Sequence, residues 1–65
     1  MSAYEEVGWL QTLARGATVA RLAGEVGYSE REMFRILSNL YQRMGVVSRT
    51  EALVQAAQWG LLESS

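Results

Sequence analysis

The stretch Gly27–Gly45, GYSEREMFRILSNLYQRMG, contains the clearest helix signal in this 65-residue sequence and the turn that precedes it. Ser29 followed by Glu32 matches a capping box, in which each side chain accepts a hydrogen bond from the other residue's backbone N–H. Gly45 follows the last apolar residue of the periodic run, where helices often end in a left-handed conformation. The pattern predicts a helix over residues 30–44.

Three further helices are predicted, over residues 4–15, 19–26 and 49–59. Thr18 is a candidate N-cap for the second of these, and Ser48 with Glu51 repeats the capping-box pattern before the last. Gly16 and Gly60 each follow an apolar run and are predicted to end helices. No segment alternates in the manner of a strand. We therefore expect an all-α fold, a compact four-helix domain.

The length supports one domain over residues 1–65, with frayed ends at residues 1–3 and 63–65. A chain this short buries only about 60% of its unfolded surface, so its 49% hydrophobic residues suffice for one small core. Helical spacing predicts the inward positions. They are Val7, Leu10 and Leu13 with Trp9 at the edge; Val19, Leu22, Ala23 and Val26; Met33, Leu37, Leu40 and Met44 flanked by Ile36 and Tyr41; and Ala52, Leu53, Ala56 and Ala57.

Several residue types are missing from the sequence, which contains no His, Cys, Asp, Lys or Pro. Zinc sites need Cys or His ligands, and the common nucleophile–base pairs need His, so we expect no metal, no cofactor and no enzyme. Glu5 and Glu6 are predicted to be solvated charges in the first turn of a helix. No apolar run approaches the roughly 18 residues of a membrane span, and a cytoplasmic domain is expected.

The second and third predicted helices are separated only by Gly27, Tyr28 and Ser29. A turn this short that contains glycine is typical of a helix-turn-helix, whose second helix enters the major groove of DNA. Short loops also occur in many other small helical domains, so the turn alone is a weak signal.

The segment LARGATVARLAGEVGYSEREMFRILSNLYQRMGVVSRTEAL, residues 13–53, resembles the DNA-binding domain of LuxR-type (GerE-type) bacterial transcription regulators. The matching positions are Leu13-Ala14, Gly16, Thr18, Leu22-Ala23, Gly27, Ser29-Glu30, Ser38-Asn39, Arg43, Gly45-Val46 and Ser48-Arg49-Thr50-Glu51-Ala52. The resemblance implies a four-helix DNA-binding domain that usually dimerises through its last helix.

The sequence departs from that family at positions used to contact DNA. Where the family often has a basic or polar residue, this chain has Ala20, Glu32, Phe34, Ile36 and Val47. Residues 29–50 carry four arginines against two glutamates, a net charge of +2, and the whole chain carries −1. Since non-specific DNA affinity comes mainly from neutralised phosphates, the sequence predicts weak binding by a monomer or another use of the surface.

Two functions are therefore open. In the first, the chain is the DNA-binding output domain of a transcription regulator, with helix 30–44 in the major groove of double-stranded DNA. Its predicted DNA contacts are Arg31 and Arg35 to bases or phosphates, Phe34 and Ser38 on the same helix, Arg43 and Arg49 to phosphates, and Thr18. In the second, a degenerate helix-turn-helix binds a protein partner through an apolar patch of Phe34, Ile36 and Val47.

The last predicted helix also has an outward side. Once its small residues face the core, Gln55, Gln58 and Trp59 remain near the surface. We expect these three residues to form a homodimer interface, because an exposed indole beside small residues suits a two-fold contact. The alternative is that Trp59 folds back on the first helix and completes the core of a monomer.

Overall fold

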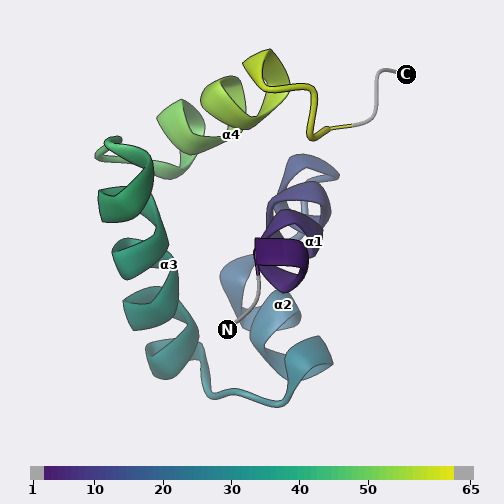
Figure 1. Ribbon diagram of the computed structural model, residues 1–65. Helices are drawn as coiled ribbons and strands as arrows, with labels where there is room; N and C mark the ends of the chain where they lie inside the picture. Colours follow the sequence, from purple (N-terminus) through teal and green to yellow (C-terminus); the bar gives the residue numbers. More distant parts are fainter. Residues whose placement is uncertain (1–2, 63–65) are drawn as a thin grey trace.

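The computed structural model describes residues 3–62 and contains four α-helices and no strand within that range (Figure 1). They are α1, Ala3–Ala14; α2, Val19–Val26; α3, Glu30–Met44; and α4, Arg49–Gln58. The predicted all-α fold is confirmed, and each boundary lies within one residue of the expected position. The predicted frayed ends lie outside the described residues, except for Ala3, which begins α1.

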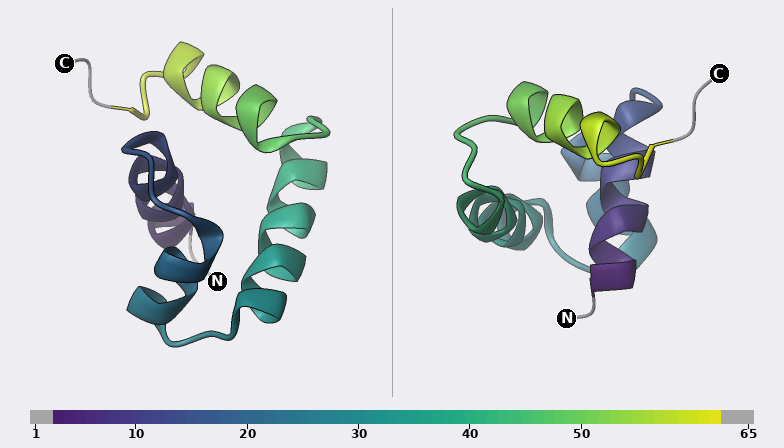
Figure 2. Two further views of the ribbon diagram at one scale, coloured as in Figure 1. Left: turned by 180° about the vertical axis from the view of Figure 1, so that it is seen from behind. Right: turned by 45° about the horizontal axis from the view of Figure 1, so that its top comes forward.

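The four helices close around one core. α1 and α2 lie together, α3 stands beside them, and α4 crosses the end of α3 and returns to α1 (Figures 1 and 2). The short segment between α2 and α3 makes the expected helix-turn-helix connection. Gly27 adopts a φ of 88° there, which is the left-handed conformation that favours glycine.

The helix starts follow the caps read from the sequence. The Thr18 hydroxyl accepts from the Arg21 N–H at 3.1 Å. Ser29 and Glu32 form the complete capping box, each accepting from the other's backbone N–H at 3.1 Å. The predicted helix ends are also confirmed, because each of the three expected glycines has a positive φ. They are Gly16, Gly45 and Gly60.

The second predicted capping box forms only in part. Ser48 caps α4 by accepting from the Glu51 N–H at 3.2 Å. The Glu51 carboxylate, however, accepts from the backbone N–H of Val47 rather than from that of Ser48. The φ of Ser48 is −148°, compared with −74° at Ser29, so the chain enters α4 with its N–H groups turned differently.

The buried core draws on all four helices. Its members are Trp9, Leu10, Leu13, Leu22, Ala23, Met33, Leu37, Leu40, Ala52 and Ala56. Residues that follow α4 also contribute, because Leu61 and Leu62 pack against this core and the Gln11 side chain donates to the Leu61 carbonyl at 3.0 Å. No helix within residues 3–62 is long and apolar enough to cross a membrane.

Five positions differ from the predicted faces. The inward stripe of α1 is Glu6, Trp9, Leu10 and Leu13, so Trp9 is only 5% exposed while Val7 is half-buried. These positions follow the 3–1–3 spacing of a helix face, which the charge at Glu6 conceals in the sequence. Two predicted core residues are instead exposed, because each lies near the end of its helix. They are Val26 on α2 and Ala57 on α4.

Candidate functional site

The outer face of α3 is not used by the fold. Arg31, Phe34, Arg35 and Ser38 are all exposed, outside the buried stripe of Met33, Leu37 and Leu40. Within residues 3–62, the side chains of Arg31, Arg35 and Ser38 form no hydrogen bond or ion pair. The predicted co-location of these four residues on one surface is confirmed, and three of them keep polar groups available for a partner.

A groove lies alongside this face and has a volume of about 500 Å³. Three segments build it: the N-terminus of α2 with Thr18, the side of α3 with Phe34, and the α3–α4 loop with Val47 and Arg49. Phe34 is 54% exposed and Val47 is 89% exposed. The groove therefore presents apolar surface beside exposed cations.

Partial burial of Tyr41, which lines the groove, raises the pKa of its hydroxyl, and the nearby charge of Arg49 acts against that rise. The phenol is protonated at neutral pH even at the ordinary tyrosine pKa of about 10, and the rise is in the same direction. Tyr41 therefore presents a neutral hydroxyl, which can both donate and accept a hydrogen bond, beside the Arg49 cation.

Both of the arginines predicted to clamp phosphates have partners within the fold. Arg43 on α3 forms an ion pair with Glu6 on α1 through two N–H···O contacts. That hydrogen bonding raises the pKa of the Arg43 guanidinium. The Glu6 carboxylate is buried, so the prediction that it is a solvated charge is wrong.

Arg49 begins α4 and reaches back to the connection between α1 and α2. Its Nη2 donates to the carbonyl of Leu13 at 3.1 Å and to that of Ala17 at 3.2 Å. Leu13 lies in the last turn of α1, where carbonyls lack partners within the helix. Arg49 therefore fixes the groove's loop against the end of α1.

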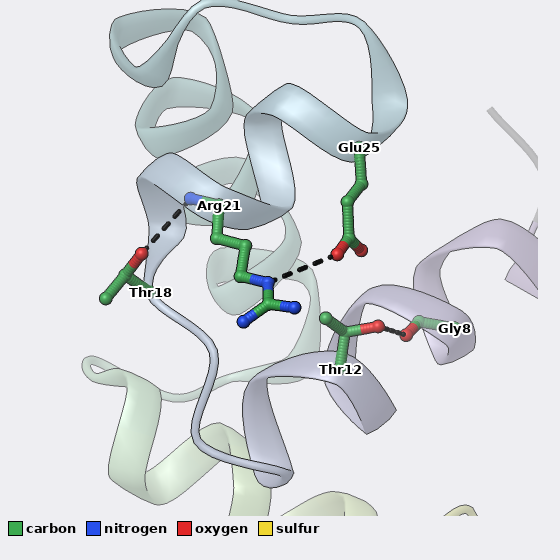
Figure 3. A network of polar contacts seen from close by, with 5 residues as sticks. All are labelled: Gly8, Thr12, Thr18, Arg21 and Glu25. Atoms are coloured by element: carbon green, nitrogen blue, oxygen red, sulfur yellow. Dashed lines mark hydrogen bonds and ion pairs between the residues drawn. The ribbon is translucent and has the colours of Figure 1, made fainter.

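No functional role is predicted for Arg21 from the sequence, and in the structure it lies outside the groove. Its side chain extends from α2 toward α1, near Thr12, and its Nε pairs with Glu25 at 3.5 Å (Figure 3). Thr12 in turn donates to the Gly8 carbonyl at 3.0 Å. Because the pair is exposed, it contributes little to stability.

The proposed apolar patch needs one correction. Ile36 is half-buried and packs against the core, so it does not share a surface with Phe34 and Val47. A step of 100° per residue places Ile36 about 200° around α3 from Phe34, on the other flank of the helix. Only Phe34 and Val47 remain as the exposed apolar pair of the groove.

The end of α4 carries the residues assigned to self-association. Gln58 and Trp59 are exposed and Gln55 is half-buried. Trp59 is 55% exposed, so the alternative in which it completes the monomer core is wrong. It borders a separate pocket of about 250 Å³ near Val7 and Leu61.

No protein-family model and no solved structure matches the chain significantly. The chain is similar to the Transcriptional regulatory protein YdfI of Bacillus subtilis (strain 168), with 38% identity over 58 residues. The match covers 89% of this chain and 27% of that protein. The chain thus spans about a quarter of the length of a curated relative that is named as a transcriptional regulator.

Proposed function

We propose that this chain is a DNA-binding domain of a transcription regulator, with α3 as its recognition helix in the major groove. The observation that carries the proposal is the outer face of α3, where Arg31, Arg35 and Ser38 are exposed and unused by the fold. The short turn after α2 and the name of the relative support the same conclusion.

Each contact is assigned from the hydrogen-bonding groups that the side chain does not use within the fold. Arg31 and Arg35 carry free guanidinium groups, which suit guanine edges or phosphates. Ser38 offers a hydroxyl, and the Thr18 hydroxyl can donate to a phosphate while it accepts from Arg21. Arg43 and Arg49 are already held by Glu6 and by backbone carbonyls, and we assign them positioning roles.

The resemblance to LuxR-type regulators supports a homodimer through the end of α4. Two free arginines per protomer neutralise few phosphates, so binding to two half-sites is the means by which this domain gains affinity. Exposed Trp59 and Gln58, with half-buried Gln55, are the proposed contact.

Sedimentation velocity with and without DNA tests this dimer. We expect Trp59→Ala to weaken association, whereas Tyr4→Ala, which removes an exposed aromatic ring from α1, serves as the matched control. A chain that remains monomeric at high micromolar concentration and on DNA would exclude the dimer.

A protein-interaction module is the second candidate. The exposure of Phe34 and Val47 in one groove favours it, as does the chain's net charge of −1. Apolar anchors of this kind are typical of protein interfaces. The cations on the neighbouring face of α3 favour DNA.

Selection of bound duplexes from a random DNA pool, followed by mobility-shift titration at low and physiological salt, separates the two candidates. We expect one sequence class to be enriched. Arg31→Ala and Arg35→Ala should each weaken its binding, while Arg21→Ala removes the same charge outside the groove and should change little. An absence of enriched duplexes at low salt would exclude the DNA-binding function.

A further inference from the structure

We propose that Phe34 and Val47 select thymine, by packing against its C5-methyl group in the major groove. This inference rests on the proposed DNA-binding function and specifies the kind of base pair that the groove recognises. It concerns the two apolar side chains of the groove, and the arginines keep the roles given above.

The geometry begins with two exposed apolar residues that come from different segments and meet at one groove. Phe34 projects from the middle of α3, and Val47 projects from the loop that leads into α4. The Arg49 contacts and the Ser48 cap hold that loop, so Val47 stays exposed on a fixed backbone. Because transfer of apolar surface out of water is favourable, a partner that covers Phe34 and Val47 lowers the free energy of the complex.

The surroundings of the groove indicate an anionic partner. Arg31 and Arg35 lie on the adjoining face of α3 without ion-pair partners among residues 3–62, and the groove itself holds one cation, Arg49, and one carboxylate, Glu30. A polyanion with apolar groups among its recognition features fits this combination. Duplex DNA has that composition, because the thymine methyl is the one apolar group among the polar base edges of the major groove.

Glu30 adds a hydrogen-bond acceptor to the groove. Glu30 lines the groove on the same side of α3 as Phe34. A carboxylate accepts hydrogen bonds, whereas guanine presents two acceptors, O6 and N7, in the major groove. Both kinds of base pair present an amino donor that Glu30 can meet, adenine N6 or cytosine N4, but only the A·T pair also presents a methyl group, which matches Phe34.

The test replaces single thymines by deoxyuridine in the duplex selected from the random pool. This change removes only the C5-methyl group and leaves every hydrogen-bonding group in place. We expect affinity to fall about fourfold at one or two positions, the value for one buried methyl-sized group. Phe34→Ala or Val47→Ala should bind the thymine and deoxyuridine duplexes equally well, whereas Tyr4→Ala should keep the difference.

The outcomes separate the two claims. Equal affinity of the unmodified chain for thymine and deoxyuridine duplexes at every position overturns the thymine inference and leaves DNA binding intact. The absence of any selected duplex overturns both. Circular dichroism of Phe34→Ala checks that the variant is folded, and the deoxyuridine comparison with the unmodified chain needs no variant.

Discussion

The Glu6 carboxylate on α1 and the Arg43 guanidinium on α3 form an ion pair that joins the two helices. The two residues are 37 positions apart in the sequence. Two N–H groups of Arg43 face the two oxygens of Glu6. This is the bidentate geometry in which a planar guanidinium binds a carboxylate. The carboxylate is nearly buried, with 9% of its side chain exposed, whereas 56% of the arginine side chain is exposed. The pair thus anchors the C-terminal part of α3 to α1.

This asymmetry predicts unequal effects of removing the two partners. Arg43→Met leaves a buried carboxylate without its cation, and Glu6→Gln leaves an arginine that water can solvate. We expect the melting temperature to fall further for Arg43→Met. Arg21→Met, which breaks the exposed pair with Glu25, is the control and should change little. An equal fall for both partners of the Glu6 pair would contradict this account.

Leu37 is predicted to be essential to the core. Its side chain is buried at the centre of α3, so Leu37→Ala should lower the free energy of unfolding by about 2–5 kcal/mol. Urea denaturation measures this loss, and Phe34→Ala on the same helix is the exposed control. If both variants unfold at the same urea concentration, the assignment of inner and outer faces is wrong.

Ser48 is predicted to act as a cap. Ser48→Ala removes the acceptor of the Glu51 N–H and should cost about 1 kcal/mol of stability. DNA affinity, measured where both chains are folded, should remain unchanged. Reduced DNA affinity without reduced stability would instead make Ser48 a phosphate contact, as residues at helix N-termini often are.

The capping box of α3 predicts a dependence of stability on pH. The backbone N–H of Ser29, then its hydroxyl, then the charge of Arg35 lower the pKa of Glu32, and desolvation opposes them. A carboxyl group whose folded pKa lies below its unfolded value stabilises the fold above the unfolded pKa. That contribution is lost as pH falls below about 4.3 and through the folded pKa.

Glu32→Gln isolates this effect, because glutamine can still accept from the Ser29 N–H but does not titrate. We expect the difference in melting temperature between the unmodified chain and the variant to shrink as pH falls below about 4.3. A difference that stays constant across that range would contradict the role of Glu32.

Local signals in the sequence were sufficient to predict the helices. Ser29 and Glu32 determine the start of α3 through contacts three residues apart, and Gly45 determines its end through its own backbone conformation. The exposure of Phe34 also followed from helical spacing alone, because the inward stripe through Leu37 fixes the outward side.

Long-range contacts could not be predicted in the same way. Nothing local indicates that Glu6 meets Arg43, since a glutamate in a first helical turn is usually solvated. Arg49 likewise resembles a surface cation in the sequence, and only the packing of α4 on the end of α1 reveals its carbonyl partners. The sequence therefore predicted phosphate contacts for two arginines, Arg43 and Arg49, whose guanidinium groups have partners within the fold.

The salt dependence of binding to the selected duplex tests the proposed DNA-binding face of α3 most directly. Each phosphate neutralised contributes about −0.9 to the slope of log affinity against log salt concentration. The double variant Arg31→Ala, Arg35→Ala should therefore have a slope shallower by about 0.9 for each of the two arginines that contacts a phosphate, up to about 1.8 per protomer. Arg21→Ala should keep the slope of the unmodified chain. A double variant with both the slope and the affinity of the unmodified chain would show that DNA is not bound by this face of α3.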